Sequence, residues 1–328
     1  MKMKVGCYLK RFKEDTVLIN KRARYIHKAR AILFSVFKFL ILLGISYIIL
    51  GPVISIISNS FYSSTDVYNP SVFLFPLRPT MGNYAIAYLR LDYWRALGFT
   101  LLFIGVITAV QVLITSMAGY GFARFDFPLK GFFFACVVIT IVLPTHTIML
   151  PLYTHFRNWD PFGLISMFLG HPANLLSSEA PMMLMTLFGV GLRSGLFIYI
   201  FRQFFRGLPK EIEEAAFIDG AGMWYTYFRI MLVNAIPAVV TVTVFSMVWQ
   251  YNDMFYSRLF RIPSDRNITF RLSTIQATIE FVDQVKDPMI SQLYVFAGVV
   301  LVLLPILVIY LILQKYFMEG VERSGIVG

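Results

Sequence analysis

The sequence has few charged residues for its length. Only 14% of its 328 residues are Asp, Glu, Lys or Arg, whereas 58% are hydrophobic. Soluble domains usually carry about 25% charged residues, so water is a poor solvent for this composition. The scarcity of charge excludes an ordinary soluble domain and indicates that the chain lies in a lipid bilayer.

Six long apolar runs contain no Asp or Glu at all, namely residues 39–58, 97–120, 132–153, 181–205, 230–249 and 293–313. A spanning helix needs about 20 mostly apolar residues, and barrel strands are much shorter. Backbone in lipid must satisfy its own hydrogen bonds, so we predict an all-α integral membrane protein with six transmembrane helices. Ion-coupled carriers commonly use buried carboxylates as proton relays, so their absence argues against a self-powered carrier.

The chain also lacks the motifs of common enzymes. No Walker-type glycine loop is present, and the four histidines show no metal-ligand spacing. In residues 191–195, Ser194 stands one position too late for a nucleophile elbow. The two cysteines, Cys7 and Cys136, lie in a basic and an apolar segment, so we expect no bridge between them. We therefore expect no catalytic residue, metal or bound cofactor in this chain.

Basic residues predict the orientation. Residues 1–38 hold eleven Lys or Arg, and an excess of these residues marks the cytoplasmic side. We expect both termini in the cytoplasm, with residues 1–38 as a basic N-terminal segment and residues 39–328 as the transmembrane domain. The basic run at residues 21–30 is expected to meet anionic headgroups rather than nucleic acid.

One charged residue, Arg193, lies deep in a predicted span. Such a residue either faces a substrate path or pairs structurally with a neighbouring helix. Gly189, Gly191 and Gly195 flank it, and small residues there allow another helix to approach closely. In the first outer loop, a short helix is expected from Asn83.

A short acidic segment stands between the fourth and fifth apolar runs. Pro209 suits the first turn of a helix, and Glu211, Glu213 and Glu214 then lie near the positive end of its dipole. Ile212 and the next two alanines are expected to share one face. Glycines 220 and 222 are expected to end this helix, and a second helix should start at about residue 223.

The same segment resembles the EAA signature of ABC-importer permeases. The resemblance consists of Glu214, Ala215 and Ala216, followed by Asp219, Gly220, Ala221, Ile230 and Leu232. One position departs, because Val233 stands where that family usually has proline, although Pro237 matches a second common proline. The coupling role of the signature rests on residues 211–222, which the departure leaves intact.

Other segments resemble the MalG-like branch, the carbohydrate permeases of the maltose and multiple-sugar type. They are residues 75–88, residues 118–127, the WQYND element at residues 249–253, and the tail at residues 318–328, with Val327 where lysine is frequent. The resemblance implies a type I ABC importer permease fold in the bacterial cytoplasmic membrane. It also implies a MalF-like second permease subunit, an ABC ATPase dimer that holds the ATP and Mg, and an extracytoplasmic solute-binding protein.

By this resemblance, residues 209–222 form a coupling helix that docks into an ATPase groove. The residues implied in docking are Glu211, Glu213, Glu214, Ala215, Ala216, Asp219 and Gly220. Sugars are held by aromatic faces and amide or hydroxyl groups, and the candidates for the substrate path are Arg193, Asn234, Trp249, Asn252 and Asp253. The aromatic candidates could equally anchor the chain at the membrane interface.

Three other functions stay open at this point. A permease for a non-sugar solute would share the coupling helix. A self-contained channel or ion-coupled carrier would transport without ATP or partners. An integral membrane enzyme is disfavoured, since the spans lack clustered His, Asp or Cys.

Overall fold

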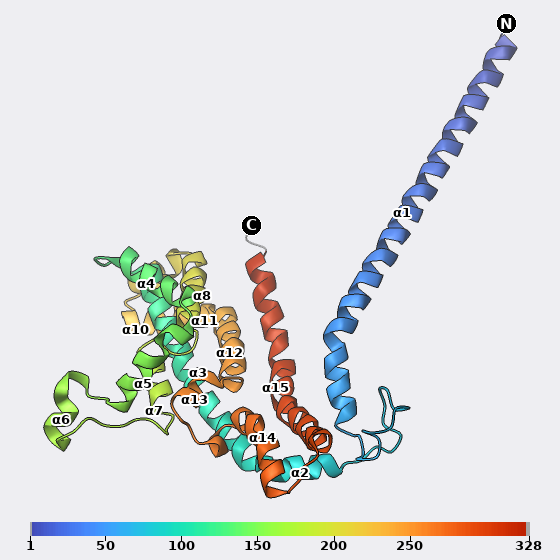
Figure 1. Ribbon diagram of the computed structural model, residues 1–328. Helices are drawn as coiled ribbons and strands as arrows, with labels where there is room; N and C mark the ends of the chain where they lie inside the picture. Colours follow the sequence, from blue (N-terminus) through green and yellow to red (C-terminus); the bar gives the residue numbers. More distant parts are fainter. Residues whose placement is uncertain (1, 326–328) are drawn as a thin grey trace. The chain divides into compact units, whose positions relative to one another are not determined.

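The computed structural model describes the backbone of residues 2–325 and the side chains of residues 28, 30–312 and 314. Two compact units are present, residues 1–59 and residues 60–328. Within the described residues the fold is all-α, and the one isolated β-bridge joins Trp159 to Ala173. The predicted fold class is confirmed (Figure 1).

The first unit is a single helix, α1, which spans Lys2–Asn59. Its part from Arg30–Asn59 is apolar enough to cross a membrane. Side chains from residue 30 to residue 50 are all exposed, which suits a helix surrounded by lipid. The backbone passes through residue 38 without a break, so the expected boundary between a basic segment and a first span lies inside one helix. The side chain of Cys7 lies outside the described side chains, while Cys136 is free and exposed.

The second unit is built from fourteen further helices. They are α2 (Gly82–Leu91), α3 (Tyr93–Arg124), α4 (Lys130–Val142), α5 (Met149–Arg157), α6 (Leu164–Leu169), α7 (Ala180–Leu187), α8 (Ser194–Gly207), α9 (Glu211–Ile218), α10 (Met223–Tyr225), α11 (Leu232–Asn234), α12 (Ile236–Tyr251), α13 (Phe255–Leu259), α14 (Ile268–Val282) and α15 (Pro288–Gly325). Short helical turns lie at η1 (Thr145–Ile148), η2 (Pro161–Gly163), η3 (Thr226–Met231, a π-helix) and η4 (Ser264–Arg266). The helix expected from Asn83 is α2.

Among the residues that the structure describes, three helices are long and apolar enough to span a membrane, or up to five if each bent pair counts as one span. The straight ones are Arg30–Asn59, Tyr93–Arg124 and Pro288–Ile312. The third predicted span bends by 104° between α4 and η1, and the fifth bends by 77° between α11 and α12. The first bend follows from Pro144, because the residue before a proline is forced out of the helical region and Leu143 is extended. Neither predicted run is a straight helix.

The fourth predicted span, residues 181–205, is not one helix either. It is divided into α7 and α8 by residues 188–193, and it is not among the candidate spans. Gly189 and Arg193 both have positive φ at this break, 73° and 60°. A helix cannot continue through a left-handed residue, so the sequence prediction of one uninterrupted span was wrong here.

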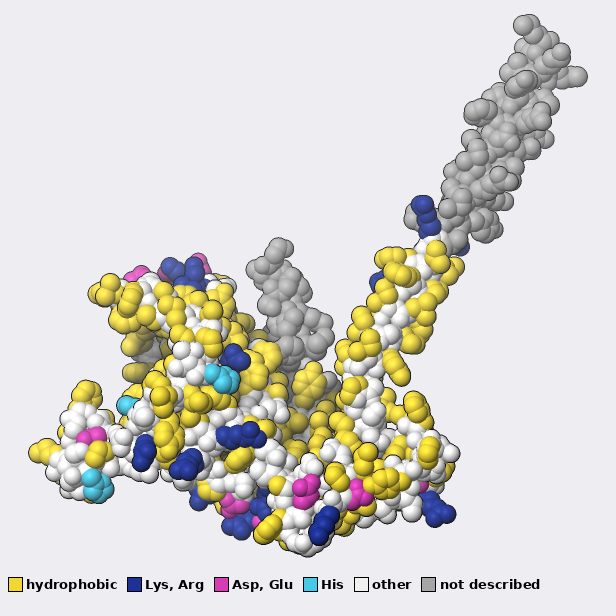
Figure 2. All heavy atoms as spheres, viewed as in Figure 1, with side chains coloured by type: hydrophobic (Ala, Val, Ile, Leu, Met, Phe, Trp, Pro, Cys, Tyr) yellow, Lys and Arg dark blue, Asp and Glu magenta, His cyan; other side chains and the backbone are white. Residues whose placement is uncertain are grey.

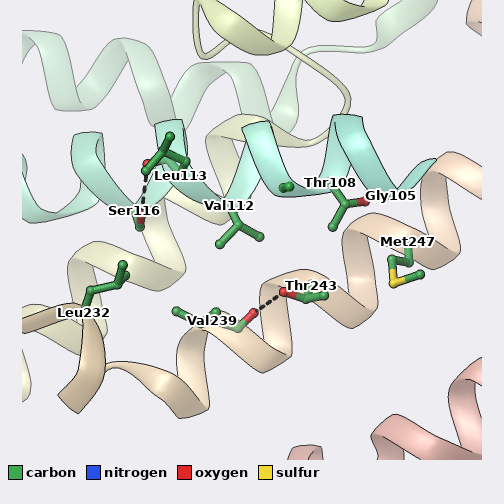
Figure 3. Close-up of a pocket in the computed structure, with 10 residues that line it drawn as sticks. Gly105, Thr108, Val112, Leu113, Ser116, Leu232, Val239, Thr243 and Met247 are labelled. Carbon is green, nitrogen blue, oxygen red and sulfur yellow. Dashed lines mark hydrogen bonds between the residues drawn. The ribbon is translucent and has the colours of Figure 1, made fainter. Parts of the chain in front are cut away.

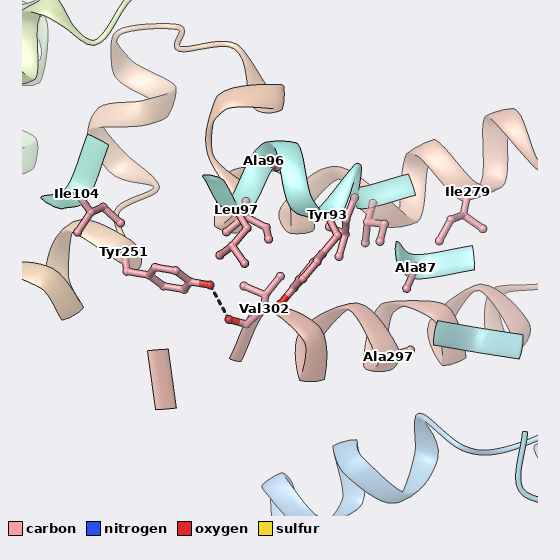
Figure 4. Close-up of a cluster of buried hydrophobic side chains, with 12 residues drawn as sticks. Ala87, Tyr93, Ala96, Leu97, Ile104, Tyr251, Ile279, Ala297 and Val302 are labelled. Carbon is pink, nitrogen blue, oxygen red and sulfur yellow. Dashed lines mark hydrogen bonds between the residues drawn. The ribbon is translucent and has the colours of Figure 1, made fainter. Parts of the chain in front are cut away.

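Helix α3 occupies the middle of the second unit and packs along α8 and α12. One buried cluster joins α2, α3, α14 and α15, with Leu91, Ile104 and Ile279 among its members (Figure 4). The Tyr251 hydroxyl reaches across from α12 and donates to the Val302 carbonyl at 2.6 Å. A buried phenol in lipid needs such a partner, so this bond fixes how α12 meets α15.

Helices α4 and α8 meet closely at Gly195. A Cβ on this glycine would lie 2.1 Å from the Thr140 Oγ1 and 3.0 Å from the Val137 carbonyl oxygen. The close helix approach expected at the glycines beside Arg193 is therefore present, and the helix that approaches is α4. Elsewhere the surface is strongly apolar, with hydrophobic side chains over much of both units (Figure 2). Apolar surface on this scale needs a bilayer or partner chains to cover it.

Candidate functional site

The acidic segment forms α9, Glu211–Ile218, which follows the end of α8 and precedes the start of α10. Three glutamates fall in its first turn, where the helix dipole favours negative charge. Pro209 precedes the helix rather than lying inside its first turn, because Lys210 is the N-cap. The second helix begins at Met223, as expected.

Gly220 ends α9 in the manner the sequence predicts. Its φ is 83°, and the Ala221 amide donates back to the Ala216 carbonyl at 2.9 Å. This is the left-handed helix terminus that glycine adopts at little cost. Gly222 has an ordinary φ of −74°, so only Gly220 makes the turn.

One side of α9 faces the protein and the other is exposed. Glu213 and Ala216 are buried, and Ile212 is half-buried against the cluster formed by α8 and η3. The exposed members of the predicted docking set are Glu211, Glu214, Ala215, Asp219 and Gly220. Ala215 and Ala216 therefore point to different sides, and the expected shared alanine face was wrong. Consecutive helical residues lie about 100° apart, so two adjacent alanines diverge.

The buried side of α9 is held by an ion pair. The Arg124 Nε lies 3.0 Å from the Glu213 Oε2, and the two side chains are 7% and 10% exposed. The Arg124 Nη2 also donates to the Leu208 carbonyl at 2.8 Å. Arg124 is the last residue of α3, so one guanidinium joins the end of α3, the connection after α8, and α9.

Aromatic packing extends this connection. Tyr120 packs against Phe205 and Tyr227 with ring centroids 5.4 and 5.2 Å apart, and the Tyr227 hydroxyl is 2.7 Å from the Ser116 Oγ. These side chains come from α3, α8 and η3. Interiors packed in this way transmit displacement rather than absorb it. An ion pair therefore joins α9 to α3, and α9 lies beside a packed core that α3 shares with α8 and η3.

A groove of about 420 Å³ runs between α3 and α12. It is lined by Gly105, Thr108, Ala109, Val112, Leu113, Ser116, Leu232, Val239, Thr243 and Met247 (Figure 3). Three of these residues carry hydroxyl groups, at positions 108, 116 and 243. The α3 members recur every three or four residues, which places them on one side of the helix. The groove is mainly apolar with a few hydrogen-bonding groups.

A buried polar network lies behind this groove. The Gln111 Nε2 donates to the Leu192 carbonyl at 2.6 Å and to the Ser194 Oγ at 3.0 Å. Its Oε1 accepts from the Ser246 Oγ at 2.7 Å and from the Gln250 Nε2 at 3.4 Å. Gln111 is fully buried. A single amide thus joins α3, the break before α8, and α12.

Two predicted substrate-path residues lie together near that break. Phe197 and Phe245 each stack against Trp249, with ring centroids 5.6 and 5.4 Å from the Trp249 ring. The Arg193 guanidinium lies 5.6 Å from the Trp249 ring centroid. Arg193 is exposed and lines a separate cavity of about 270 Å³ with Tyr256. Trp249 is half-buried, and its ring contacts two phenylalanines and Arg193.

The other predicted path residues serve local backbone bonds. The Asn234 and Asn252 amides donate to the carbonyls of Ile230 and Val248, each at 2.8 Å. Asp253 is buried and accepts from the Tyr256 and Ser257 amides at 3.3 and 3.2 Å. Burial raises the pKa of Asp253, and these amide hydrogen bonds act in the opposite direction. None of the five predicted residues lines the groove between α3 and α12.

Sequence reasoning missed Arg124, Gln111 and the groove. The signal for the groove was present, since Gly105, Thr108 and Ala109 begin a helically spaced row of small or hydroxyl residues. No spacing rule could have paired Arg124 with Glu213, because 89 positions separate them and their contact depends on how α8 and α9 pack. In the part of the chain that the structure describes, no group of three His, Cys, Asp or Glu could hold a metal ion.

Known proteins are similar to this chain in sequence. Residues 111–323 match the family described as binding-protein-dependent transport system inner membrane component. A probable ABC transporter permease protein of Pyrococcus horikoshii is 28% identical over 282 residues, covering 85% of this chain and 92% of the relative. The arabinooligosaccharides transport system permease protein AraQ of Halalkalibacterium halodurans is 25% identical over 287 residues, covering 87% and 93%.

A solved structure supports the same fold. A bacterial ABC transporter involved in the import of the acidic polysaccharide alginate contains a chain with a TM-score of 0.67 and 20% identity, covering 87% of this chain and 96% of that one. The family match alone extends over more than half of the sequence and includes α9, the Arg124–Glu213 pair and the groove residues from Val112 onward. The chain therefore belongs to the binding-protein-dependent transport system inner membrane components, the membrane-embedded permeases of ABC transporters.

Proposed function

We propose that the chain is the permease subunit of an ATP-driven importer that takes up a carbohydrate, most simply an oligosaccharide. An extracytoplasmic binding protein delivers the sugar, a second, MalF-like permease completes the pathway, and a separate ATPase dimer hydrolyses ATP. The observation that carries the proposal is the α9 arrangement, which is exposed on one side and joined to α3 by Arg124 and Glu213 on the other.

The exposed side of α9 is the proposed docking surface for the ATPase. Glu214 offers a carboxylate, and Ala215 allows another chain to approach closely because its side chain is small. Glu213 has a different role from the one that the resemblance implies, since its carboxylate points inward to Arg124. Docking displaces α9, and the ion pair carries that displacement to α3. The permease then has two states, biased by nucleotide bound to another subunit.

The groove between α3 and α12 is the proposed part of the sugar pathway in this subunit. Its three hydroxyl groups already hydrogen-bond within the protein, Thr108 with Ser246, Ser116 with Leu113 and Tyr227, and Thr243 with Val239. The groove therefore offers a sugar few polar groups and a mainly apolar wall rather than a strong binding site. A transport path needs this balance, because a tightly held substrate is not released. AraQ is named for arabinooligosaccharides and the structural relative imports alginate, which supports a carbohydrate as the solute.

The proposed orientation places α9 and both chain ends in the cytoplasm. The positive-inside rule supports it, because residues 1–38 are rich in Lys and Arg. The same side then holds α9 and the end of α3. An ATPase that consumes cytoplasmic ATP can reach α9 only in this orientation.

Deletion of the gene followed by uptake assays with radiolabelled oligosaccharides tests the proposal. Wild-type protein should restore uptake of one carbohydrate, whereas Gly220→Pro and Glu214→Lys should insert normally and fail to restore it. Gly222→Ala is the matched control, since Gly222 has no special backbone angle. If the wild-type protein instead restores uptake of a non-carbohydrate solute, the sugar assignment is wrong and the permease assignment stands. Full uptake in both α9 variants would refute the coupling role.

Purification of the chain from native membranes gives a second test. An ATPase and a second permease should accompany it in fixed proportion, and ATP should drive uptake into vesicles made from the purified complex. Transport by the purified chain alone, without ATP, would establish a self-contained channel or carrier instead.

A further inference from the structure

A second cavity, of about 360 Å³, lies where the ends of α3 and α8 meet the start of α4. It is lined by Phe122, Ala123, Arg124, Lys130, Arg202, Arg206 and Lys210. Five of these seven residues are basic, and no acidic residue lines it. Figure 2 shows Lys and Arg side chains gathered at the end of the second unit where Figure 1 labels α4 and α8. Positive charge of this density needs a compensating anion.

Only part of this charge is balanced within the protein. Arg124 pairs with Glu213, and Lys130 lies 3.2 Å from Asp126. The other three basic residues, Arg202, Arg206 and Lys210, have no carboxylate partner among the described residues. Arg202 and Arg206 stand four positions apart on α8, an arrangement in which like charges repel. The cavity therefore carries an excess of three positive charges.

The geometry also holds one of these groups in place. The Arg202 guanidinium lies 3.7 Å from the Phe134 ring centroid, and its Nε donates to the Phe122 carbonyl at 3.4 Å. An arginine stacked on a ring and hydrogen-bonded through Nε keeps its terminal N–H groups free for an anion. Arginine in this state suits phosphate, since its planar fork matches two phosphate oxygens.

The surroundings point to a lipid. The cavity lies at the end of α3, a helix long and apolar enough to span a membrane, so it falls where that helix meets the headgroup layer. Phe132 and Phe133, on the adjoining turn of α4, are exposed and can contact acyl chains. Basic pockets between such helix ends bind anionic headgroups. We propose that this cavity binds the phosphate group of an anionic phospholipid, held by Arg202, Arg206 and Lys210.

Lipid binding by the purified full-length complex tests the proposal. Phosphatidylglycerol and phosphatidylcholine of identical short chains are added in detergent, and bound lipid is counted by native mass spectrometry. The test variant combines Arg202→Gln, Arg206→Gln and Lys210→Gln. The control combines Arg78→Gln, Arg157→Gln and Lys286→Gln, which removes equal charge at exposed positions of the second unit that do not line the cavity.

Wild-type protein and the control should prefer phosphatidylglycerol, and the test variant should lose that preference by roughly 150-fold, given the usual effect of three basic residues near an anionic headgroup. A double variant, Arg206→Gln with Lys210→Gln, spares the Arg202 stacking contact and should lose an intermediate amount even if the triple variant folds poorly. Equal phosphatidylglycerol binding by the double variant and the control would overturn the proposal.

Competition distinguishes a lipid from a soluble anion. Excess inorganic phosphate should displace little phosphatidylglycerol, because it cannot reproduce the acyl-chain contacts. Displacement by inorganic phosphate as effective as that by unlabelled phosphatidylglycerol would support the phosphate site but assign it to a soluble phosphate. The readout is binding, so it stands apart from any result on sugar transport.

Discussion

Arg124 and Glu213 form a buried ion pair with 3.0 Å between Nε and Oε2. The pair connects the last residue of α3 to the first turn of α9. Buried pairs contribute little net stability, because desolvation of both charges offsets their attraction, but removal of one partner leaves the other charge uncompensated. The ion pair therefore contributes mainly by holding α3 and α9 in a fixed position relative to each other.

The first prediction concerns this pair. Glu213→Ala should destabilise the protein by about 3–5 kcal/mol, since it leaves the Arg124 charge buried and unpaired. The combination of Arg124→Met with Glu213→Leu should recover most of that loss. Thermal unfolding of the purified complex measures both, with the exposed Glu214→Gln as the control for folding. A double variant no more stable than Glu213→Ala would contradict the charge argument.

The second prediction concerns the turn after α9. Gly220→Ala should cost roughly 1–2 kcal/mol locally, because a residue with a Cβ is strained at a φ of 83°. Gly222→Ala should have no such effect. No heavy atom lies within 4 Å of a Cβ built at either position, so the two differ in backbone angle and not in space. Hydrogen exchange of the α9 amides measures this effect. Exchange should be faster than in the wild type in Gly220→Ala but not in Gly222→Ala.

The third prediction concerns the Gln111 network. Gln111→Leu keeps a side chain of similar size but leaves the Ser246 hydroxyl and the Leu192 carbonyl without their shared partner. The expected loss is about 1–3 kcal/mol, the usual cost of unsatisfied buried polar groups. Gln203→Leu, at an exposed position of α8, is the matched control. Equal melting temperatures of the two variants would show that the network does not hold α3, α8 and α12 together.

The fourth prediction uses the pKa of Asp253, which burial raises above 3.8. As pH increases from 3.8 toward the folded-state pKa, the unfolded carboxyl ionises first, so stability falls across that window and is constant above it. Asp253→Asn removes this dependence and keeps an oxygen acceptor for the amides of α13. The melting temperature of Asp253→Asn relative to wild type should therefore be higher at about pH 7 than at about pH 4.

A further variant at the same position separates two roles. Asp253→Ala should be about 0.5–2 kcal/mol less stable than Asp253→Asn at any pH, because the Tyr256 and Ser257 amides lose their acceptor and neither variant titrates at this position. Unchanged sugar uptake in Asp253→Asn is expected if this carboxylate only supports α13. A selective loss of substrate affinity in that variant, with normal stability, would return Asp253 to the substrate path.

Much of the fold could be predicted from the sequence because hydrophobic runs and glycines act locally. The apolar runs predicted helices, and the glycine at 220 predicted a turn that the structure contains. The breaks in the third and fifth runs follow from local chemistry as well, but hydropathy averages over a window and hides them. The break at Arg193 had no such signal, since a positive φ at arginine depends on the contacts around it.

The sequence by itself determined the solvent, the helical class and the acidic segment after α8, since composition, periodicity and turn residues express short-range physics. Only the tertiary structure decided which side of α9 is buried, that Glu213 belongs to Arg124, and that the groove lies between α3 and α12 rather than beside Trp249. Those outcomes depend on the packing of helices far apart in the chain. Side chains that meet across such distances are selected by shape and by the need to satisfy every buried polar group.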